Sequence, residues 1–267
     1  MKIIIFGSNG MLGRYLNNFL SEIYDVVPIT RKDIDLSKSN ENEILKFLST
    51  HVSEKDLIIN AAGVIKQREY NINDMINVNS IFPNLLSKFK KNINCNIIHI
   101  TTDCVYNGLK GNYTENDYHD CLDEYGKTKS LGENKDLTII RTSIIGEEIN
   151  NKKSLIEWAK SQSNKTINGY SNHLWNGITC LELSKLIDNM IKTKNFWPGV
   201  KHIFSPKTVS KYELLNIINE IYNLNIIINK IETPEKCFRN LNSLYTSPIE
   251  LNLYDQIIEI KKFNNKL

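Results

Sequence analysis

The stretch that decides the fold is FGSNGMLG, residues 6 to 13, in which glycines recur at every third position. It follows the short apolar run IIIF (3 to 6), which is typical of a buried strand. It also opens the segment MLGRYLNNFLSEI (11 to 23), whose apolar residues are spaced to lie on one face of a helix. The sequence therefore predicts a strand that turns directly into a helix through a glycine-rich loop.

Each glycine of this loop has a mechanical reason. Gly7 permits the tight turn, Gly10 lets the backbone approach a pyrophosphate, and Gly13 lets the helix press on the sheet. The N-terminus of the helix then faces the anion. We therefore expect a bound dinucleotide, and the residues expected to contact it here are Gly7, Asn9, Gly10, Met11 and Leu12.

Outward from this unit, short apolar runs keep alternating with helix-like segments through residue 143. The further strands are expected in DVVPIT (25 to 30), DLIINAA (56 to 62), CNIIHITT (95 to 102) and LTIIRTS (137 to 143). Repeated βα units of this kind predict an α/β fold, a doubly wound parallel sheet of the Rossmann type with helices on both faces.

After residue 143 the rhythm loosens. Helices are expected in SLIEWAKSQ (154 to 162), TCLELSKLIDNMIK (179 to 192) and SKYELLNIINEIY (210 to 222), and strands in KHIFS (201 to 205) and IIINKIE (226 to 232). We therefore predict a dinucleotide-binding domain over residues 1–143. Residues 144–267 should form mainly a smaller substrate-binding lobe, with a part near 177–205 returning to the first domain.

Composition excludes several functional classes. The net charge of +3 is spread over a chain of 267 residues in which basic and acidic side chains alternate, so nucleic-acid binding is not indicated. No apolar run approaches the ~20 residues of a membrane span, and MKIIIF is too short for a signal-peptide core. The 5 cysteines form no CxxC pair and the 5 histidines no HxxxH or HExxH pattern. We expect a soluble, cytoplasmic protein with reduced thiols and no metal site.

The end of the second strand bears on the choice of dinucleotide. An acidic residue there would bind the ribose hydroxyls of NAD, whereas an arginine can hold the additional 2′-phosphate of NADP. Arg31 occupies this place in DVVPITRKDIDL (25 to 36), which favours NADPH over NADH, although a loop arginine can also be a simple solvated charge. Asp35 and Leu36 are expected near the adenine.

Two later strand ends carry small or polar residues. NAAG (60 to 63) ends a strand with Ala61, Ala62 and Gly63, which suits a backbone lying against a cofactor, and HITTDCVYNG (99 to 108) ends another strand with hydroxyls and an acid. Because carboxyl ends of parallel strands share one edge of the sheet, these segments should line one crevice.

A tyrosine and a lysine four residues apart occur twice in the sequence. The pair Tyr106 and Lys110 is interrupted by Gly108, which favours a turn. The pair Tyr125 and Lys129 in DEYGKTK (123 to 129) lies where a helix can stack both side chains on one face. From spacing alone, this second pair is either an acid with its electrostatic partner or a surface pair.

Taken in order, these segments resemble the extended short-chain dehydrogenase/reductases, and within them the dTDP-4-dehydrorhamnose reductase group. The resemblance covers the first 143 residues through FGSNGMLG, NAAG, VN at 78 and 79, TTDCVYNG, YGKTK with the trailing GE, and IIRTS. The C-terminal half is similar more loosely, through WNGIT (175 to 179) and SPKTVSKYELL (205 to 215).

The resemblance implies NADPH-dependent reduction of the C4 keto group of a dTDP- or UDP-linked 4-keto-6-deoxy hexose, as in rhamnose-type deoxysugar biosynthesis, by a homodimer. Tyr125 would donate the proton, and Lys129 would lower the pKa of the Tyr125 phenol and hold the nicotinamide ribose. Thr102 would hydrogen-bond the substrate oxygen. The residues expected to contact the substrate are Asp103, Trp175 and Asn176.

Cys104 separates the activities that the resemblance leaves open. Nucleotide-sugar 4,6-dehydratases follow the hydroxyl with Asp and Glu, and the missing Glu argues against that class. The reductases usually have Tyr at this place, whereas bifunctional epimerase/reductases that make GDP-fucose and plant UDP-rhamnose carry a cysteine. Cys104 could therefore be an epimerisation base with His173 as its acid. Alternatively, Cys104 is a packed small hydrophobe and His173 binds a loop.

A second class of function also stays open. The regulatory β subunit of methionine adenosyltransferase is similar to the same reductase group, so a non-catalytic NADP-binding subunit is the rival hypothesis. The complete set Thr102, Tyr125 and Lys129 favours the enzyme.

Overall fold

A six-stranded parallel sheet forms the centre of the computed structural model, which describes residues 1–66, 71–149, 152–246 and 249–266. Its strands are β1 (Lys2–Phe6), β2 (Asp25–Ile29), β3 (Leu57–Asn60), β4 (Asn96–Thr102), β5 (Thr138–Thr142) and β10 (Gly199–His202). They lie in the order β10-β5-β4-β3-β1-β2, and every neighbouring pair is parallel. The predicted fold class is confirmed. The strand order reverses between β1 and β3, which is where sheets of this kind bind ligands.

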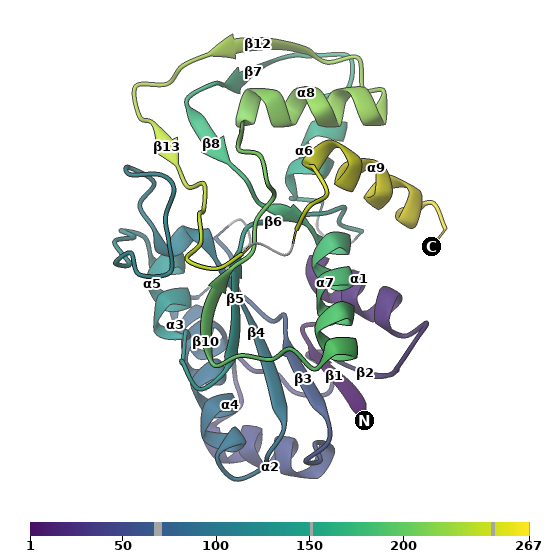
Figure 1. Cartoon of the computed structure of the whole chain (residues 1–267), viewed down its shortest axis with the longest axis vertical. Coiled ribbons are helices and arrows are strands. Elements are labelled where there is room, and N and C mark those ends of the chain that lie inside the picture. The colour runs from purple at the N-terminus through teal and green to yellow at the C-terminus, as the bar shows by residue number, and fades with distance from the viewer. Residues whose placement is uncertain (67–70, 150–151, 247–248, 267) are drawn as a thin grey trace.

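Both faces of the sheet are buried, as its uninterrupted apolar strands require. Ile3 and Ile5 of β1 face one hydrophobic cluster, while Ile4 and Phe6 face another. Helices α1 (Met11–Leu20) and α7 (Cys180–Thr193) cover the first face. Helices α2 (Glu41–His51) and α4 (Phe82–Lys90) cover the second face (Figure 1).

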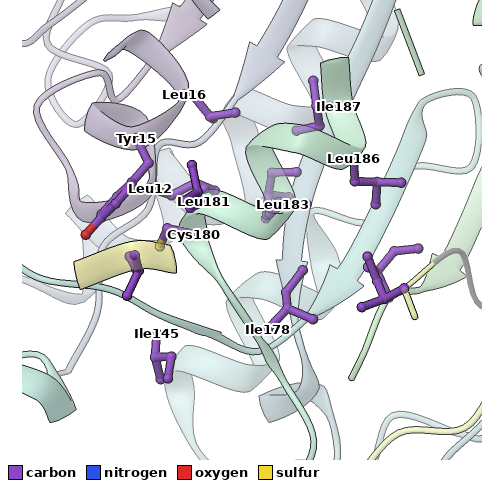
Figure 2. Packing of buried hydrophobic residues seen from close by; sticks show 14 of the residues in the cluster. Leu12, Tyr15, Leu16, Ile145, Ile178, Cys180, Leu181, Leu183, Leu186 and Ile187 are labelled. Carbon is purple, nitrogen blue, oxygen red and sulfur yellow. The ribbon is translucent and has the colours of Figure 1, made fainter. Parts of the chain in front are cut away.

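The helix that follows the glycine loop owes its place to its apolar stripe. Leu12, Leu16 and Leu20 are spaced four apart and fully or almost fully buried. Figure 2 shows side chains of α1 gathered with Leu181 and Ile187 of α7 in one cluster. The two helices thus pack against each other as well as on the sheet.

The second face contains an irregular helix that matters for the site. Helix α3 (Ile72–Ile76) continues through a π-helical turn, η1 (Asn77–Ile81), into α4. Asn79 on η1 is buried, accepts from Val64 N at 2.9 Å, and donates to Val64 O at 3.0 Å and to the Thr128 hydroxyl at 3.2 Å. It thereby ties the segment after β3 to helix α5 (Glu124–Leu131).

Three smaller sheets lie beyond the carboxyl end of β5, toward one end of the molecule (Figure 1). They pair β7 (Thr166–Tyr170) with β12 (Ile227–Ile231), β6 (Ile144–Ile145) with β9 (Ile178–Thr179), and β8 (His173–Trp175) with both β11 (Val209–Ser210) and β13 (Cys237–Phe238). The helices α6 (Leu155–Ser161), α8 (Lys211–Tyr222) and α9 (Leu253–Asn264) accompany them. Two elements of the C-terminal half belong to the main sheet instead: α7 packs on its first face, and β10 pairs with β5 at its edge.

Candidate active site

The glycine loop has the geometry that a bound pyrophosphate requires. Gly7 adopts φ +77°, and a Cβ added to it would lie 2.7 Å from Ala62 Cα. A Cβ on Gly13 would lie 2.1 Å from Gly7 O, so the first turn of α1 presses directly on the loop. Gly7 thus permits the tight turn as expected, whereas Gly13 lets the helix approach the loop and not the sheet.

The N-terminus of α1 is open toward a ligand. Gly10 is its N-cap residue, and no side chain accepts a hydrogen bond from the first amides of the helix. A Cβ on Gly10 would meet only Gly7 O, at 3.1 Å. Free amides and the helix dipole favour an anion at this point. The loop therefore fits the pyrophosphate of a dinucleotide.

One cavity, of about 500 Å³, lies over the ends of β1 and β2. Its walls include Asn9, Arg31, Asp35 and Leu36. Arg31 is exposed at its rim, and the Asp35 carboxylate accepts from the Ser37 hydroxyl at 2.7 Å. The structure thus brings the residues predicted from the second strand end to the same cavity as the glycine loop.

A second cavity, of about 470 Å³, lies over the ends of β3, β4 and β5. Gly10 and the segment 61–63 line both cavities, so the two are adjacent parts of one cleft. The second cavity is further lined by Met11, Leu12, Ile65, Lys66, Ile100, Thr101, Thr102, Asp103, Cys104, Asp123, Tyr125, Lys129, Thr142, Ser143, Ile144, Glu148 and Arg239. Within the described residues, every predicted cofactor contact lines one or both cavities.

Tyr125 lies beside Thr102 in the second cavity. Asp123 caps α5 by accepting from Gly126 N at 2.8 Å, and this helix start presents Tyr125 to the end of β4. The Thr102 hydroxyl lies close enough to the phenol to lower its pKa. Burial, and next the neighbouring Cys104, raise the pKa of Tyr125 above its usual value, so the phenol is protonated at neutral pH.

Lys129 does not have the electrostatic effect on Tyr125 that the sequence led us to expect. Its side chain is buried and its Nζ donates to Ile100 O in β4 at 2.9 Å. Burial lowers the pKa of Lys129 to about 8. The pKa of Tyr125 is raised and not lowered as expected, and burial of the phenol is the largest cause.

The other tyrosine–lysine pair, Tyr106 and Lys110, does not lie on a helix, as predicted. Gly108 adopts φ +89° between Tyr106 and Lys110. Tyr106 is fully buried and stacks on Tyr113 with ring centroids 4.1 Å apart. It is a core residue outside the cleft.

Asp103 and Cys104 form one wall of the second cavity. Asp103 is buried, and its Oδ1 accepts from the Thr102 hydroxyl at 3.2 Å. Burial raises the pKa of Asp103, and the nearby cations of Arg239 and Lys211 oppose this rise. Burial, and next the Asp103 carboxylate, raise the pKa of the Cys104 thiol to about 12. The thiol is therefore protonated at neutral pH.

His173 lies outside both cavities. Its Nε2 is 2.9 Å from Thr233 Oγ1 and 3.1 Å from Glu235 O, and its ring packs near Tyr170. The structure therefore shows His173 in contact with a loop, as in the second alternative, and not on the cavity wall that carries Cys104.

The two substrate contacts predicted from WNGIT are also absent from the cavity walls. Asn176 is buried, donates to Leu241 O and accepts from Leu241 N, both at 2.8 Å. Trp175 is buried beneath the Lys211 ammonium, which lies 5.3 Å from its ring centroid. The prediction was wrong for Asn176 because its amide is already satisfied by the backbone.

Sequence reasoning missed four charged residues of the second cavity, Lys66, Asp123, Glu148 and Arg239. Lys66 pairs with Asp123 at 3.2 Å near the start of α5, and Arg239 reaches the cavity from the segment after β13. Asp123 could have been found, because an aspartate three residues before Gly126 at a helix start indicates an N-cap. Nothing in the sequence around Arg239 indicates its position.

Comparison with known proteins identifies the family. A family model described as "RmlD substrate binding domain" matches residues 1–243. The chain belongs to this family. It is 27% identical over 247 residues to the spore coat polysaccharide biosynthesis protein SpsK of Bacillus subtilis, covering 88% of this chain and 84% of SpsK. It is also 27% identical to a dTDP-4-dehydrorhamnose reductase of Aggregatibacter actinomycetemcomitans, covering 79% of this chain and 76% of that protein.

The fold of a solved family structure is similar throughout. The dTDP-4-dehydrorhamnose reductase of Bacillus anthracis, in complex with NADP, superposes with a TM-score of 0.80 at 20% identity, covering 100% of this chain and 99% of that one. The family resemblance inferred from the sequence motifs is thereby confirmed.

In the described ranges, His, Cys, Asp and Glu nowhere gather in a group of three or more that could hold a metal ion. Among the helices of those ranges, none combines the length and the apolar character that crossing a bilayer demands.

Proposed function

We propose that the protein uses NADPH to reduce the C4 keto group of a nucleotide-linked 4-keto-6-deoxy hexose, with dTDP or UDP as the nucleotide. The observation that carries this proposal is the adjacency of Thr102, Tyr125 and Lys129 to the cleft that fits a dinucleotide. Membership in the RmlD family and the names of the relatives support the substrate class.

The cleft residues divide the reaction between them. The glycine loop at Gly10 and the residues that line the two cavities would hold NADPH, which would supply the hydride. The protonated phenol of Tyr125 donates the proton to the carbonyl oxygen, and the Thr102 hydroxyl orients that oxygen. Lys129 holds its ammonium at the end of β4, where positive charge favours the developing alkoxide.

Two observations support NADPH as the cofactor. Arg31 stands exposed at the rim of the adenine-side cavity, where a guanidinium can bind a 2′-phosphate. The similar Bacillus anthracis reductase is described in complex with NADP. NADH remains a slower alternative donor in this proposal.

The test is a product assay. Purified protein is incubated with NADPH or NADH and with dTDP- or UDP-linked 4-keto-6-deoxy sugars, and products are identified by mass and NMR. We expect C4 reduction with one nucleotide series, faster with NADPH. If no sugar nucleotide is reduced and a partner enzyme co-purifies stably, the rival hypothesis of a non-catalytic subunit, similar to the methionine adenosyltransferase β subunit, is correct.

We further propose that no epimerisation accompanies the reduction. A base must be deprotonated, but burial raises the pKa of Cys104 to about 12, and His173 is engaged by Thr233 and Glu235. With the 4-keto substrate in D₂O and no hydride donor, the protein should wash no deuterium into C3 or C5 beyond a protein-free control. Deuterium uptake that disappears in Cys104→Ser would show that Cys104 is a base after all.

The expected homodimer also remains part of this proposal. Ile76, Ile81 and Leu131 are 36%, 44% and 69% exposed on the contiguous elements α3, η1 and α5. Exposed apolar side chains that gather on contiguous elements are typical of an interface with another protein chain. Light scattering of the purified protein distinguishes a dimer from a monomer.

A further inference from the structure

Arg239 is one of the charged residues of the second cavity to which the proposed reaction gives no role. Its Nη1 donates to Cys104 Sγ at 3.5 Å. Its Nε is buried and has no hydrogen-bond partner within the part of the chain that the structure describes. A buried N–H without an acceptor is costly, so this arrangement fits an acceptor that arrives with a ligand.

The other deeply buried arginine shows what such a side chain normally binds. Arg141 donates from Nε to Glu133 Oε1 at 3.0 Å and from Nη2 to Glu133 Oε2, so one edge of the guanidinium holds two carboxylate oxygens. In Arg239, Nη1 contacts Cys104, and no hydrogen bond joins the Nε–Nη2 edge to an acceptor among the described residues. That edge matches two oxygens carried by one carboxyl or phosphoryl group.

The charges around Arg239 also favour an anion. Lys66 is already paired with Asp123 at 3.2 Å. Deeper in the wall, Arg239 and Lys211 both interact with the single carboxylate of Asp103. Two cations against one carboxylate leave a positive charge that a bound anion can balance.

We propose that the Nε–Nη2 edge of Arg239 binds the diphosphate of the nucleotide sugar and so anchors the substrate in the second cavity. Cys104 then acts as a positioning residue, because its Sγ holds Nη1 and turns the free edge toward the ligand. This inference rests on the proposed function, since only a nucleotide-linked substrate carries the diphosphate.

The backbone that carries Arg239 is held by contacts that do not involve its side chain. Phe238 N donates to Gly108 O at 2.6 Å, and Leu241 exchanges two hydrogen bonds with Asn176. A substitution of the Arg239 side chain should therefore leave the segment in place.

The experiment measures the binding of dTDP, UDP, thymidine and uridine by calorimetry in the presence of NADP⁺. A hydrogen bond to a charged group contributes about 1.5–3 kcal/mol, so Arg239→Gln should raise the Kd of the better-bound diphosphate by about 10-fold to 100-fold. Its nucleoside should bind unchanged. Arg239→Lys keeps the charge without the fork and should recover only part of the affinity. Lys185→Gln removes a charge on α7, where Lys185 pairs with Glu259, and serves as the control.

Each other outcome overturns a different statement. Equal diphosphate affinity in the wild type and Arg239→Gln overturns the role of Arg239, while C4 reduction by the wild type would leave the proposed function intact. Equal losses for nucleoside and diphosphate overturn the contact with phosphate. An unchanged Kd for UDP with a raised Kd for UDP-glucuronic acid overturns the diphosphate assignment in favour of a sugar carboxylate. A wild type that binds neither diphosphate and reduces no keto sugar overturns the proposed function itself.

Discussion

Tyr125 illustrates what a sequence motif does and does not determine at the scale of one residue. The resemblance of its motif to the reductases, and not the spacing alone, predicted that Tyr125 lies near Thr102, and the two side chains lie close together. The direction of its pKa shift was not predictable, because burial by distant segments sets it. A protonated phenol suits proton donation at neutral pH all the same.

Replacing this phenol tests the proposed mechanism directly. Tyr125→Phe keeps the ring and removes the proton, so turnover should fall by about 10² to 10⁴ while the Kd for NADPH is unchanged. Steady-state rates and fluorescence titration of NADPH measure the two quantities. Tyr118→Phe, at a side chain that is 93% exposed, should react at the wild-type rate. Near-normal turnover in folded Tyr125→Phe would exclude Tyr125 as the proton donor.

Whether another site residue was predictable depends on whether neighbouring residues in the sequence place it at the site. Gly10, Arg31 and Asp103 were predictable, because each follows directly from the end of a strand that the sequence reveals. Arg239 was not, because its segment reaches the cavity through contacts with Gly108 and Asn176, which lie far away in sequence. Asn176 was assigned to the substrate because its motif gives no sign of the hydrogen bonds that its amide makes with the distant Leu241 backbone.

At the scale of elements, the sequence predicted the helices and strands that carry a continuous apolar run or a periodic apolar face. The strands β1 to β5 and the helices α1 and α7 have continuous apolar runs or apolar faces. Strands β6, β9, β11 and β13 span two residues each, which is too short for any period. Helix α9 is absent from the predicted elements, although its buried residues Leu253, Ile257 and Ile260 follow helical spacing.

The junction between β1 and α1 gives a test at this scale. Alanine usually stabilises a helix by about 1 kcal/mol relative to glycine. At Gly13, however, the added Cβ would lie 2.1 Å from Gly7 O, so Gly13→Ala should lower the free energy of unfolding by about 1–3 kcal/mol through overpacking.

Urea denaturation of matched variants measures this difference. In Gly63→Ala the nearest atom to the new Cβ is Asn79 Oδ1 at 3.6 Å, an ordinary contact, so its unfolding midpoint should stay near that of the wild type. A Gly13→Ala protein as stable as Gly63→Ala would mean that the loop and α1 can separate without cost.

At the scale of the whole molecule, one buried polar network joins the main sheet to the C-terminal segment. Arg141 on β5 donates to His202 Nε2 at 2.8 Å and to the Tyr106 hydroxyl at 2.5 Å. His202 Nδ1 in turn lies 2.7 Å from Asn242 O and 3.1 Å from Tyr113 O. Because the backbone carbonyls accept from Nδ1, Nε2 is left as the acceptor for Arg141 and the imidazole is neutral. The network thus holds the segment that carries Arg239 against the sheet.

Neutral His202 makes the stability of the fold depend on pH. Burial, and next Arg141, lower the pKa of His202 from 6.5 to about 4. Between these values the unfolded chain binds a proton that the folded protein does not, so stability present above pH 6.5 is lost as the pH falls toward 4. At ~1.4 kcal/mol per pKa unit, His202 should account for a loss of about 3 kcal/mol. At pH 7, His202→Gln should have a lower free energy of unfolding than the wild type. On acidification this free energy should fall less in the variant, so the two stability curves should converge near pH 4. Urea denaturation across this range measures both curves, and parallel curves would mean that folding does not lower the pKa of His202.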